Sequence, residues 1–186
     1  MLKKILCAGL LASSSVFAHA AVQSFTFSYA GFYDEENATF DSAQILSGSF
    51  SGEDGDHDGR FSKGELTTLM VGGTDYIACA ASNSSYYQCG AENFSYSKGG
   101  VLHFSVTQGG SDPEGWVYGY HSIIAGDVDS TLRVHPENVW KRNMHWTPET
   151  AFSITNTSPV PEPSTYAMLA LGLLAMTALQ RRRQGR

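Results

Sequence analysis

Short stretches with an alternating pattern of side chains fill the middle of the chain. In residues 22–29, hydroxyl-bearing residues alternate with mainly aromatic ones. A period of two is typical of a β-strand with one buried face, and aromatic and β-branched residues favour strands. Comparable segments recur along the chain, and we expect turns between them at Gly99-Gly100, Gly109-Gly110, Asp112-Pro113, Gly126-Asp127 and Thr147-Pro148. The pattern predicts strands at 22–29, 38–50 (as one or two strands), 76–80, 86–89, 93–97, 101–107, 116–124, 131–134, 139–145 and 151–155.

The clearest hairpin is predicted between 94–96 and 102–106, joined across a turn that contains Gly99 and Gly100. Residues 31–37 are expected to form an acidic turn, and residues 66–70 a short helical turn. No long helical period of 3.6 residues occurs between residues 21 and 155. We therefore predict an all-β fold, an antiparallel β-sandwich of the jelly-roll type, as a single domain over 21–155.

The two ends of the chain have a different composition from the middle. Residues 1–20 begin with Lys3 and Lys4, continue with an apolar stretch and end in Ala18-His19-Ala20, which predicts a cleaved signal peptide. Residues 156–186 are predicted to form a polar linker, a proline-containing box, an apolar helix at 166–179 and a basic end. Arginines resist crossing a membrane, so this order is typical of a transmembrane anchor with the domain outside the cytoplasm. The apolar run is short for a full span, and a buried helix is the alternative.

The C-terminal segment resembles the PEP-CTERM sorting signal of Gram-negative bacteria. The resemblance is carried by the box Val160-Pro161-Glu162-Pro163, by the apolar helix and by the cluster Arg181, Arg182 and Arg183. It implies that an exosortase, a membrane-embedded transpeptidase, recognises the chain and removes the tail. It also implies a transient anchor in the inner membrane, followed by delivery to the cell surface or the extracellular matrix.

Charge and cysteine content indicate in which compartment the protein works and which partners it can bind. Residues 21–158 contain 17 Asp or Glu and 6 Lys or Arg, a formal charge of 6 − 17 = −11, compared with −6 for the whole chain. So acidic a domain repels nucleic acid, which we exclude as a partner. An even pair of cysteines in an exported protein predicts a disulfide between Cys79 and Cys89, although two free thiols are the alternative.

Residues 54–65 match the calcium-loop pattern D-x-D-x-D-G-x5-E in full. Carboxylates at alternate positions converge on one hard cation, Gly59 allows the sharp turn, and the last residue closes the site. The loop resembles an EF-hand loop, but a strand precedes it, so we expect a strand–loop–helix variant. An acidic turn that binds no metal is the alternative. The predicted Ca²⁺ ligands are Asp54, Asp56, Asp58, the Arg60 carbonyl, Ser62 through water, and Glu65.

No motif in the sequence indicates catalysis. The chain lacks H-E-x-x-H and G-x-S-x-G, and no spacing singles out a pair of catalytic carboxylates. Trp116, Tyr118 and Tyr120 recur at every second position and are candidates for stacking on sugar rings, unless they fill or cover the core. We therefore predict a non-enzymatic, calcium-stabilised surface or matrix protein. The alternatives are a secreted module that binds exopolysaccharide and, with less support, a secreted hydrolase.

Overall fold

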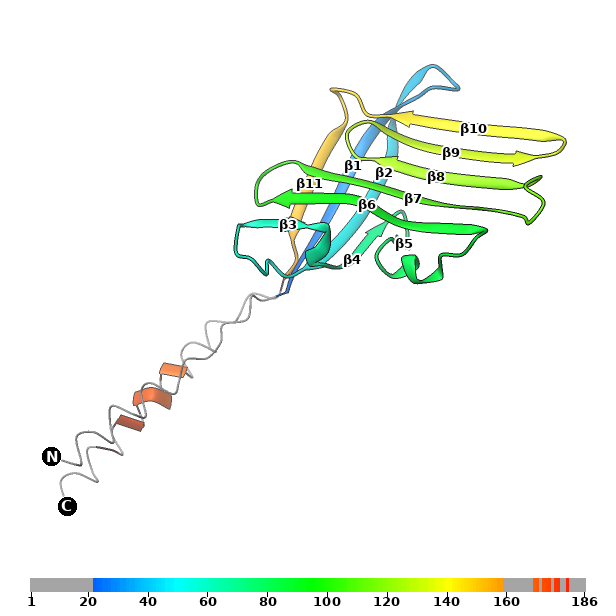
Figure 1. Cartoon of the computed structure of the whole chain (residues 1–186). Helices are drawn as coiled ribbons and strands as arrows, with labels where there is room; N and C mark the ends of the chain where they lie inside the picture. Colours follow the sequence, from blue (N-terminus) through cyan, green and yellow to red (C-terminus); the bar gives the residue numbers. More distant parts are fainter. Residues whose placement is uncertain (1–21, 159–168, 171, 175, 178–179, 181–186) are drawn as a thin grey trace.

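The computed structural model describes residues 22–158 and, near the C-terminus, residues 169–170, 172–174, 176–177 and 180 (Figure 1). The domain contains eleven strands and two 3-10 helices in its described part. The strands are β1 Gln23–Asp34, β2 Thr39–Gly52, β3 Arg60–Ser62, β4 Leu66–Val71, β5 Thr74–Asp75, β6 Tyr87–Ser97, β7 Leu102–Ser111, β8 Tyr118–Ile124, β9 Val128–His135, β10 Asn138–His145 and β11 Ala151–Asn156. The 3-10 helices are η1 Lys63–Glu65 and η2 Ala78–Ser82.

All the strand pairings form one antiparallel sheet that does not close. The order is β3-β6-β7-β8-β9-β10-β1-β2-β4-β5, with β11 also paired to β1. Strand β1 connects the two halves, because its first part pairs with β11 whereas Tyr33 and Asp34 pair with β10. Between these parts lies Gly31, with a φ of 84°, where the register with β2 shifts. Glycine adopts this conformation without a steric penalty, so the strand can serve both halves.

The two halves of the sheet pack against each other and enclose an aromatic core. We call strands β3 and β6 to β10 the longer layer, and strands β1, β2, β4, β5 and β11 the shorter layer. Figure 1 shows β1, β2 and β11 crossing the long strands β6 to β8. Rings meet between the layers at centroid distances of 4.9 to 5.6 Å, in the pairs Phe50–Phe94, Phe25–Tyr96 and Phe27–Phe104. Burying one such ring contributes roughly 1.5–3 kcal/mol, and ring geometry adds about 0.5–1.5 kcal/mol. Hydrophobic burial between facing layers therefore holds the domain together.

The predicted all-β, antiparallel class is confirmed, and the facing layers have the arrangement of a sandwich. The jelly-roll detail is wrong. Strands β6 to β10 follow one another as neighbours in a meander, whereas a jelly roll passes back and forth between its two sheets. The predicted hairpin is confirmed by the register of β6 and β7, in which Phe94 lies opposite Phe104 and Tyr96 opposite Leu102.

Several local predictions are corrected by tertiary contacts. The first part of the expected turn at 31–37 belongs to strand β1, in which Phe32 and Asp34 are buried, and the turn itself occupies residues 35–38. The pair Gly109-Gly110 lies inside β7 rather than between strands. The predicted strand 76–80 is instead replaced largely by the 3-10 helix η2. Glycine and acidic clusters therefore mark bends and close contacts here as well as chain turns.

The described residues of the C-terminal segment, from 169 to 180, are helical. Among the residues that the structure describes, no helix is both long and apolar enough to cross a membrane. The predicted signal peptide at 1–20 and the sorting box lie outside the described residues, as do parts of the predicted helix at 166–179. Asn156 ends β11, and the next two residues remain attached to β1, since Thr157 N donates to Ser24 O at 2.8 Å and Ser24 N donates to Ser158 Oγ at 2.8 Å.

Candidate functional site

The acidic loop 54–65 connects β2 to β4 and is fixed to the domain at three places. Phe61 is fully buried, with its ring 5.6 Å from that of Phe25 and 6.1 Å from that of Phe50. Strand β3, within the loop, pairs with the end of β6. Glu53 N donates to Glu65 O at 3.0 Å, which joins the two ends of the loop. The buried Phe61 side chain therefore attaches the loop to the hydrophobic core.

The segment that follows the loop is strand β4, so the predicted helical exit is wrong. Leu66 and Leu69 are both buried although they are three residues apart, a spacing that is also found on a helix. In the structure this spacing arises from a bulge, where Gly52 pairs with Leu66 but Ser51 pairs with Thr68. A bulge adds one residue to a strand and returns the next side chain to the same face. The element is therefore a strand–loop–strand unit.

Three carboxylates of the loop converge. Oxygen atoms of Asp54, Asp56 and Asp58 all lie within 4.8 Å of one another. Ca²⁺ binds oxygen at 2.3–2.6 Å, so ligands on opposite sides of one ion are separated by at most about 5 Å. Asp54 Oδ1 is buried and has no hydrogen-bond partner among the described residues. A buried carboxylate oxygen without a partner is costly, and a cation satisfies it, so these residues fit a Ca²⁺ ion.

Backbone hydrogen bonds hold the loop in the conformation that brings these carboxylates together. Gly59 N donates to Asp54 Oδ2 at 3.1 Å, and Arg60 N donates to Asp58 Oδ1 at 2.7 Å. His57 and Gly59 have φ values of 60° and 78°, in the left-handed region. Such a conformation is readily available to glycine and is costly for histidine. The loop is thus pre-formed by its own side chains.

Glu65 has a different position from the three aspartates. Its Oε1 accepts from Gly55 N at 2.9 Å, and its Oε2 accepts from Ser62 N at 2.8 Å and from Ser62 Oγ at 2.9 Å. These hydrogen bonds, the one from the Ser62 backbone first, lower the pKa of Glu65 below its ordinary value of 4.5. Glu65 is outside the converging cluster, and the exposed Arg60 and Ser62 side chains lie on β3. A carboxylate oxygen has several lone pairs, so these bonds do not prevent it from also binding a cation.

The disulfide predicted between the two cysteines is present in the structure. Cys79 lies in η2 and Cys89 in β6, with Cα atoms 5.7 Å apart. Cys89 is buried in the core, and η2 packs beside β6. The disulfide therefore attaches an irregular segment to the longer layer of the sandwich.

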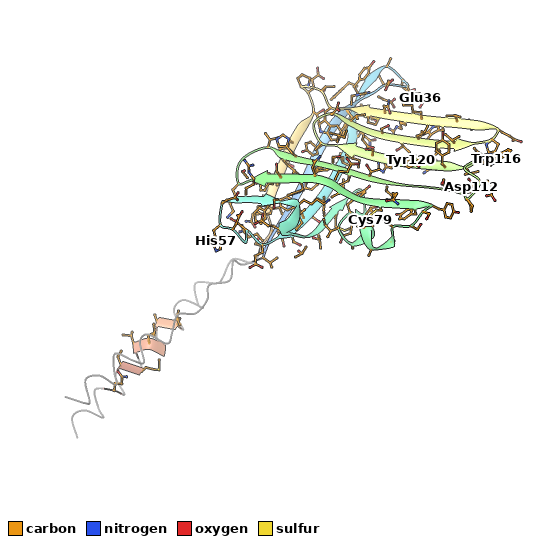
Figure 2. The ribbon with its side chains drawn as sticks, viewed as in Figure 1. Glu36, His57, Cys79, Asp112, Trp116 and Tyr120 are labelled. Atoms are coloured by element: carbon orange, nitrogen blue, oxygen red, sulfur yellow. A yellow bond between two sulfur atoms is a disulfide. The ribbon has the colours of Figure 1, made fainter. Side chains whose placement is uncertain are left out.

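The aromatic residues proposed for sugar stacking do not form one strand face. Tyr118 and Tyr120 lie in β8 with ring centroids 6.0 Å apart, whereas Trp116 precedes the strand and is 67% exposed. Figure 2 shows Trp116 beside Asp112, at the end of the domain opposite His57 of the acidic loop. A side chain on Gly109 would collide with the Tyr120 ring, which shows that this ring lies against the backbone of β7.

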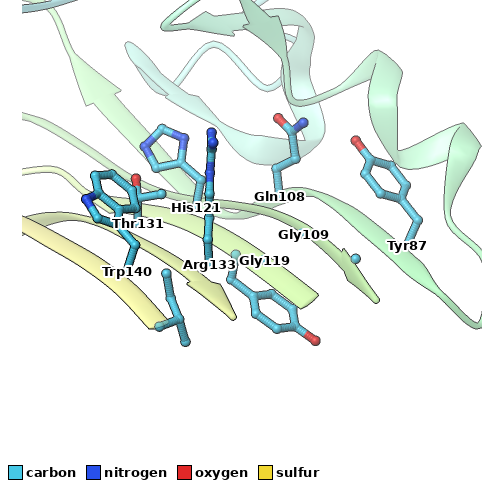
Figure 3. A pocket seen from close by; sticks show the side chains of 11 residues that line it. Tyr87, Gln108, Gly109, Gly119, His121, Thr131, Arg133 and Trp140 are labelled. Carbon is cyan, nitrogen blue, oxygen red and sulfur yellow. The ribbon is translucent and has the colours of Figure 1, made fainter. Parts of the chain in front are cut away.

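An open hollow of about 520 Å³ lies on the longer layer, and of these three aromatic residues only Tyr120 is among those that line it. Figure 3 shows Tyr87, Gln108, His121, Thr131, Arg133 and Trp140 rising from the same side of neighbouring strands. We call this hollow the inner-face groove. The sequence did not identify it, because these six residues come from five strands, β6 to β10. Only the register of the sheet could have revealed that they share a face.

Comparison with known proteins bears on the C-terminal segment. Residues 159–183 match the PEP-CTERM protein-sorting motif. No curated protein and no solved structure gives a significant match to the chain. The match includes Val160, Pro161, Glu162 and Pro163 and the cluster 181–183, all of which lie outside the described residues.

The matched motif supports an exported protein that an exosortase recognises. It implies transient membrane anchoring through the C-terminus. The predicted sorting class is therefore confirmed, and the domain itself is placed in no family by these comparisons.

Proposed function

We propose that the chain is a non-enzymatic protein of the cell surface or extracellular matrix. An exosortase cleaves it from its inner-membrane anchor, and one Ca²⁺ ion stabilises its β-domain. The sorting motif at 159–183 supports export and processing. The disulfide and the acidic loop suit an oxidising exterior that contains calcium. We assign no reaction to the domain, and a broad screen for hydrolase activity tests this.

The observation that carries the calcium proposal is the buried, unpartnered Oδ1 of Asp54 beside two other carboxylates. In the proposed complex, Asp54, Asp56 and Asp58 supply oxygen ligands, and Glu65 closes the loop. The ion would neutralise like charges that repel each other at short range. Because Glu53 N and Glu65 O already connect the ends of the loop, binding would rigidify the junction between β2 and β4.

Calcium titration of the purified domain, followed by calorimetry, tests the site directly. We expect one ion per chain, with the weak affinity of an extracellular module, about 10⁻⁴–10⁻³ M. Asp54→Asn should abolish binding. Asp127→Asn makes the same charge change in the exposed turn between β8 and β9, and should leave binding intact. If both variants bind Ca²⁺ equally, the heat of titration comes from unspecific attraction of the ion to the acidic surface.

The sorting proposal is tested by the intact mass of the protein recovered from the surface of its native host. We expect a product that begins at Ala21 and ends between Val160 and Pro163. Replacing Pro161 and Pro163 by alanine should retain the full tail and keep the protein in the membrane fraction. A surface product that still contains residues 181–186 would contradict removal of the tail.

A further inference from the structure

The inner-face groove begins where the core ends. Val106 of β7 and Ile123 of β8 lie opposite each other and are fully buried. Two residues further along, the same face carries Gln108 opposite His121, which are only partly buried. Thr74 of β5 donates to Gln108 Oε1 at 3.1 Å. Strand β5 is the edge of the shorter layer. Beyond this edge the shorter layer no longer covers the longer layer, whose inner face is therefore exposed.

The floor of the groove is open because two glycines face each other on it. Gly110 of β7 lies opposite Gly119 of β8, between Tyr87 on one side and Arg133 on the other. A Cβ on Gly119 would meet Leu132 O at 3.4 Å and the Arg133 side chain at 3.7 Å, which is ordinary contact. The absence of a side chain at Gly119 is therefore not forced by packing, whereas a Cβ on Gly110 would collide with Tyr86 O at 2.7 Å. From β6 to β10 the groove crosses four strand spacings, or about 19 Å.

The groove combines aromatic rings with planar polar groups. Trp140 is 40% exposed, and the Arg133 guanidinium lies 5.8 Å from its ring centroid, in a cation–π arrangement that restrains its orientation. His121 Nε2 lies 2.7 Å from Asp129 Oδ1, so this imidazole is held in place and the carboxylate already has a partner. Rings that stack and fixed groups that hydrogen-bond are the means by which proteins hold a sugar chain.

The charge of the groove differs from that of the domain. Arg133 is one of 6 basic residues among 17 acidic ones between 21 and 158, and like all of the six except Arg142 it forms none of the ion pairs found in the described part of the chain. No Asp or Glu is among the residues that line the groove. A guanidinium fork binds a carboxylate through two parallel hydrogen bonds. The groove crosses the faces of paired strands, so it offers no open strand edge with which an extended peptide could pair.

We propose that the inner-face groove binds an acidic polysaccharide, with Trp140 and Tyr87 contacting sugar rings and Arg133 binding a uronate carboxylate. Gln108, His121 and Thr131 face the bound polysaccharide and supply hydrogen bonds to it. This proposal uses no residue of the acidic loop and does not depend on calcium binding. It moves the sugar-binding surface from Trp116, which lies outside the strands, and from the face of β8 that carries Tyr118 and Tyr120, to the face that carries His121 and to another tryptophan.

Calorimetric titration with uronate hexamers derived from alginate, with a neutral glucose hexamer as comparison, tests the proposal. We expect the folded domain to bind the uronate hexamer and to bind the neutral one at least about tenfold more weakly. Arg133→Ala and Trp140→Ala should each weaken binding about tenfold or more. Arg133→Lys should recover only part of it, because the ammonium lacks the fork. Gly119→Val should fill the floor and block binding.

Two control variants make the result specific to this groove. Lys141→Ala removes the same charge from the other face of β10, and Trp116→Ala removes an exposed tryptophan outside the groove; both should bind within about twofold of the parent. Circular dichroism establishes that each variant is folded. The proposal is overturned if the parent binds neither hexamer or binds both equally. It is also overturned if binding is lost in Trp116→Ala and kept in Trp140→Ala. A separate loss of calcium binding would leave it standing.

Discussion

Replacing Asp54 by asparagine is the sharpest test of how calcium and stability are coupled in this domain. The change keeps an oxygen that can accept from Gly59 N, a bond now made at 3.1 Å by Oδ2. It removes the negative charge and the second oxygen, which is the buried one without a partner. The variant should therefore fold like the parent without calcium and differ from it only when calcium is added.

The expected size of the effect follows from linkage. With a dissociation constant of about 10⁻⁴–10⁻³ M, 10 mM CaCl₂ stabilises the parent by roughly 1.4–2.7 kcal/mol. A domain of about 140 residues unfolds with an entropy near 0.3 kcal/mol/K, so the melting temperature should rise by about 5 to 9 °C. In Asp54→Asn the rise should fall below about 1 °C.

Thermal unfolding followed by circular dichroism, in chelator and in CaCl₂, measures this difference. Asp127→Asn is the matched control and should show the parent's full shift. MgCl₂ should shift the melting temperature less, since Mg²⁺ demands a near-ideal octahedron and dehydrates reluctantly. A parent whose melting temperature is the same in chelator and in CaCl₂ would refute the reasoning, because the orphaned oxygen would then need no cation.

Two further predictions concern the rest of the domain. Replacing Cys79 and Cys89 by serine should cost about 3 kcal/mol in the free energy of unfolding, measured in urea, because the bond closes a loop with a sequence separation of 10. An unchanged value would mean that the disulfide does not stabilise the domain. Burial raises the pKa of Tyr29 and of Tyr76 to about 12. Both lie above the ordinary value of 10, so the stability that these phenols contribute should be complete below pH 10 and be lost as pH rises through 12. Tyr29→Phe should reduce this alkaline loss, as measured by unfolding at pH 8 and pH 11.

The sequence predicted those parts of the fold that depend on neighbours along the chain. Alternation around Phe94 and Phe104 gave the correct hairpin, because both residues face the same core across one short turn. The calcium-loop pattern likewise located the converging carboxylates of residues 54–58, since its spacing encodes a single local turn. Local patterns succeed where the structure that they describe is itself local.

Prediction failed where a residue's environment is set by distant strands. The helical turn expected at 66–70 is a strand, in which a bulge against β2 places Leu66 and Leu69 on the same face. Gly109 and Gly110 suggested a turn, yet they lie inside β7, where Gly109 makes room for the Tyr120 ring. The same reason explains why Trp116 was chosen over Trp140 as a sugar-binding residue. Which face a side chain occupies depends on the sheet register, and no stretch of sequence contains that register.

The two candidate sites lie at opposite ends of one strand, and this separation bears on how the domain works. On β6, Ser97 pairs with the acidic loop and Tyr87 borders the groove. Ten residues of strand separate them by about 34 Å. The loop also begins beside the residues that lead to the sorting motif, because Gln23 pairs with Gly52 and the next residue, Ser24, is hydrogen-bonded to Ser158.

Calcium would therefore act on the end of the domain from which the tail leaves, whereas the groove is carried by the far ends of the long strands. Sites this far apart, with no shared residues, are expected to contribute additively to free energy. Removing the tail should thus leave the groove unchanged, so the anchored and the released protein would have the same affinity for a polysaccharide. On this reasoning the sorting step determines where the domain acts, and the inner-face groove determines which polysaccharide it binds there.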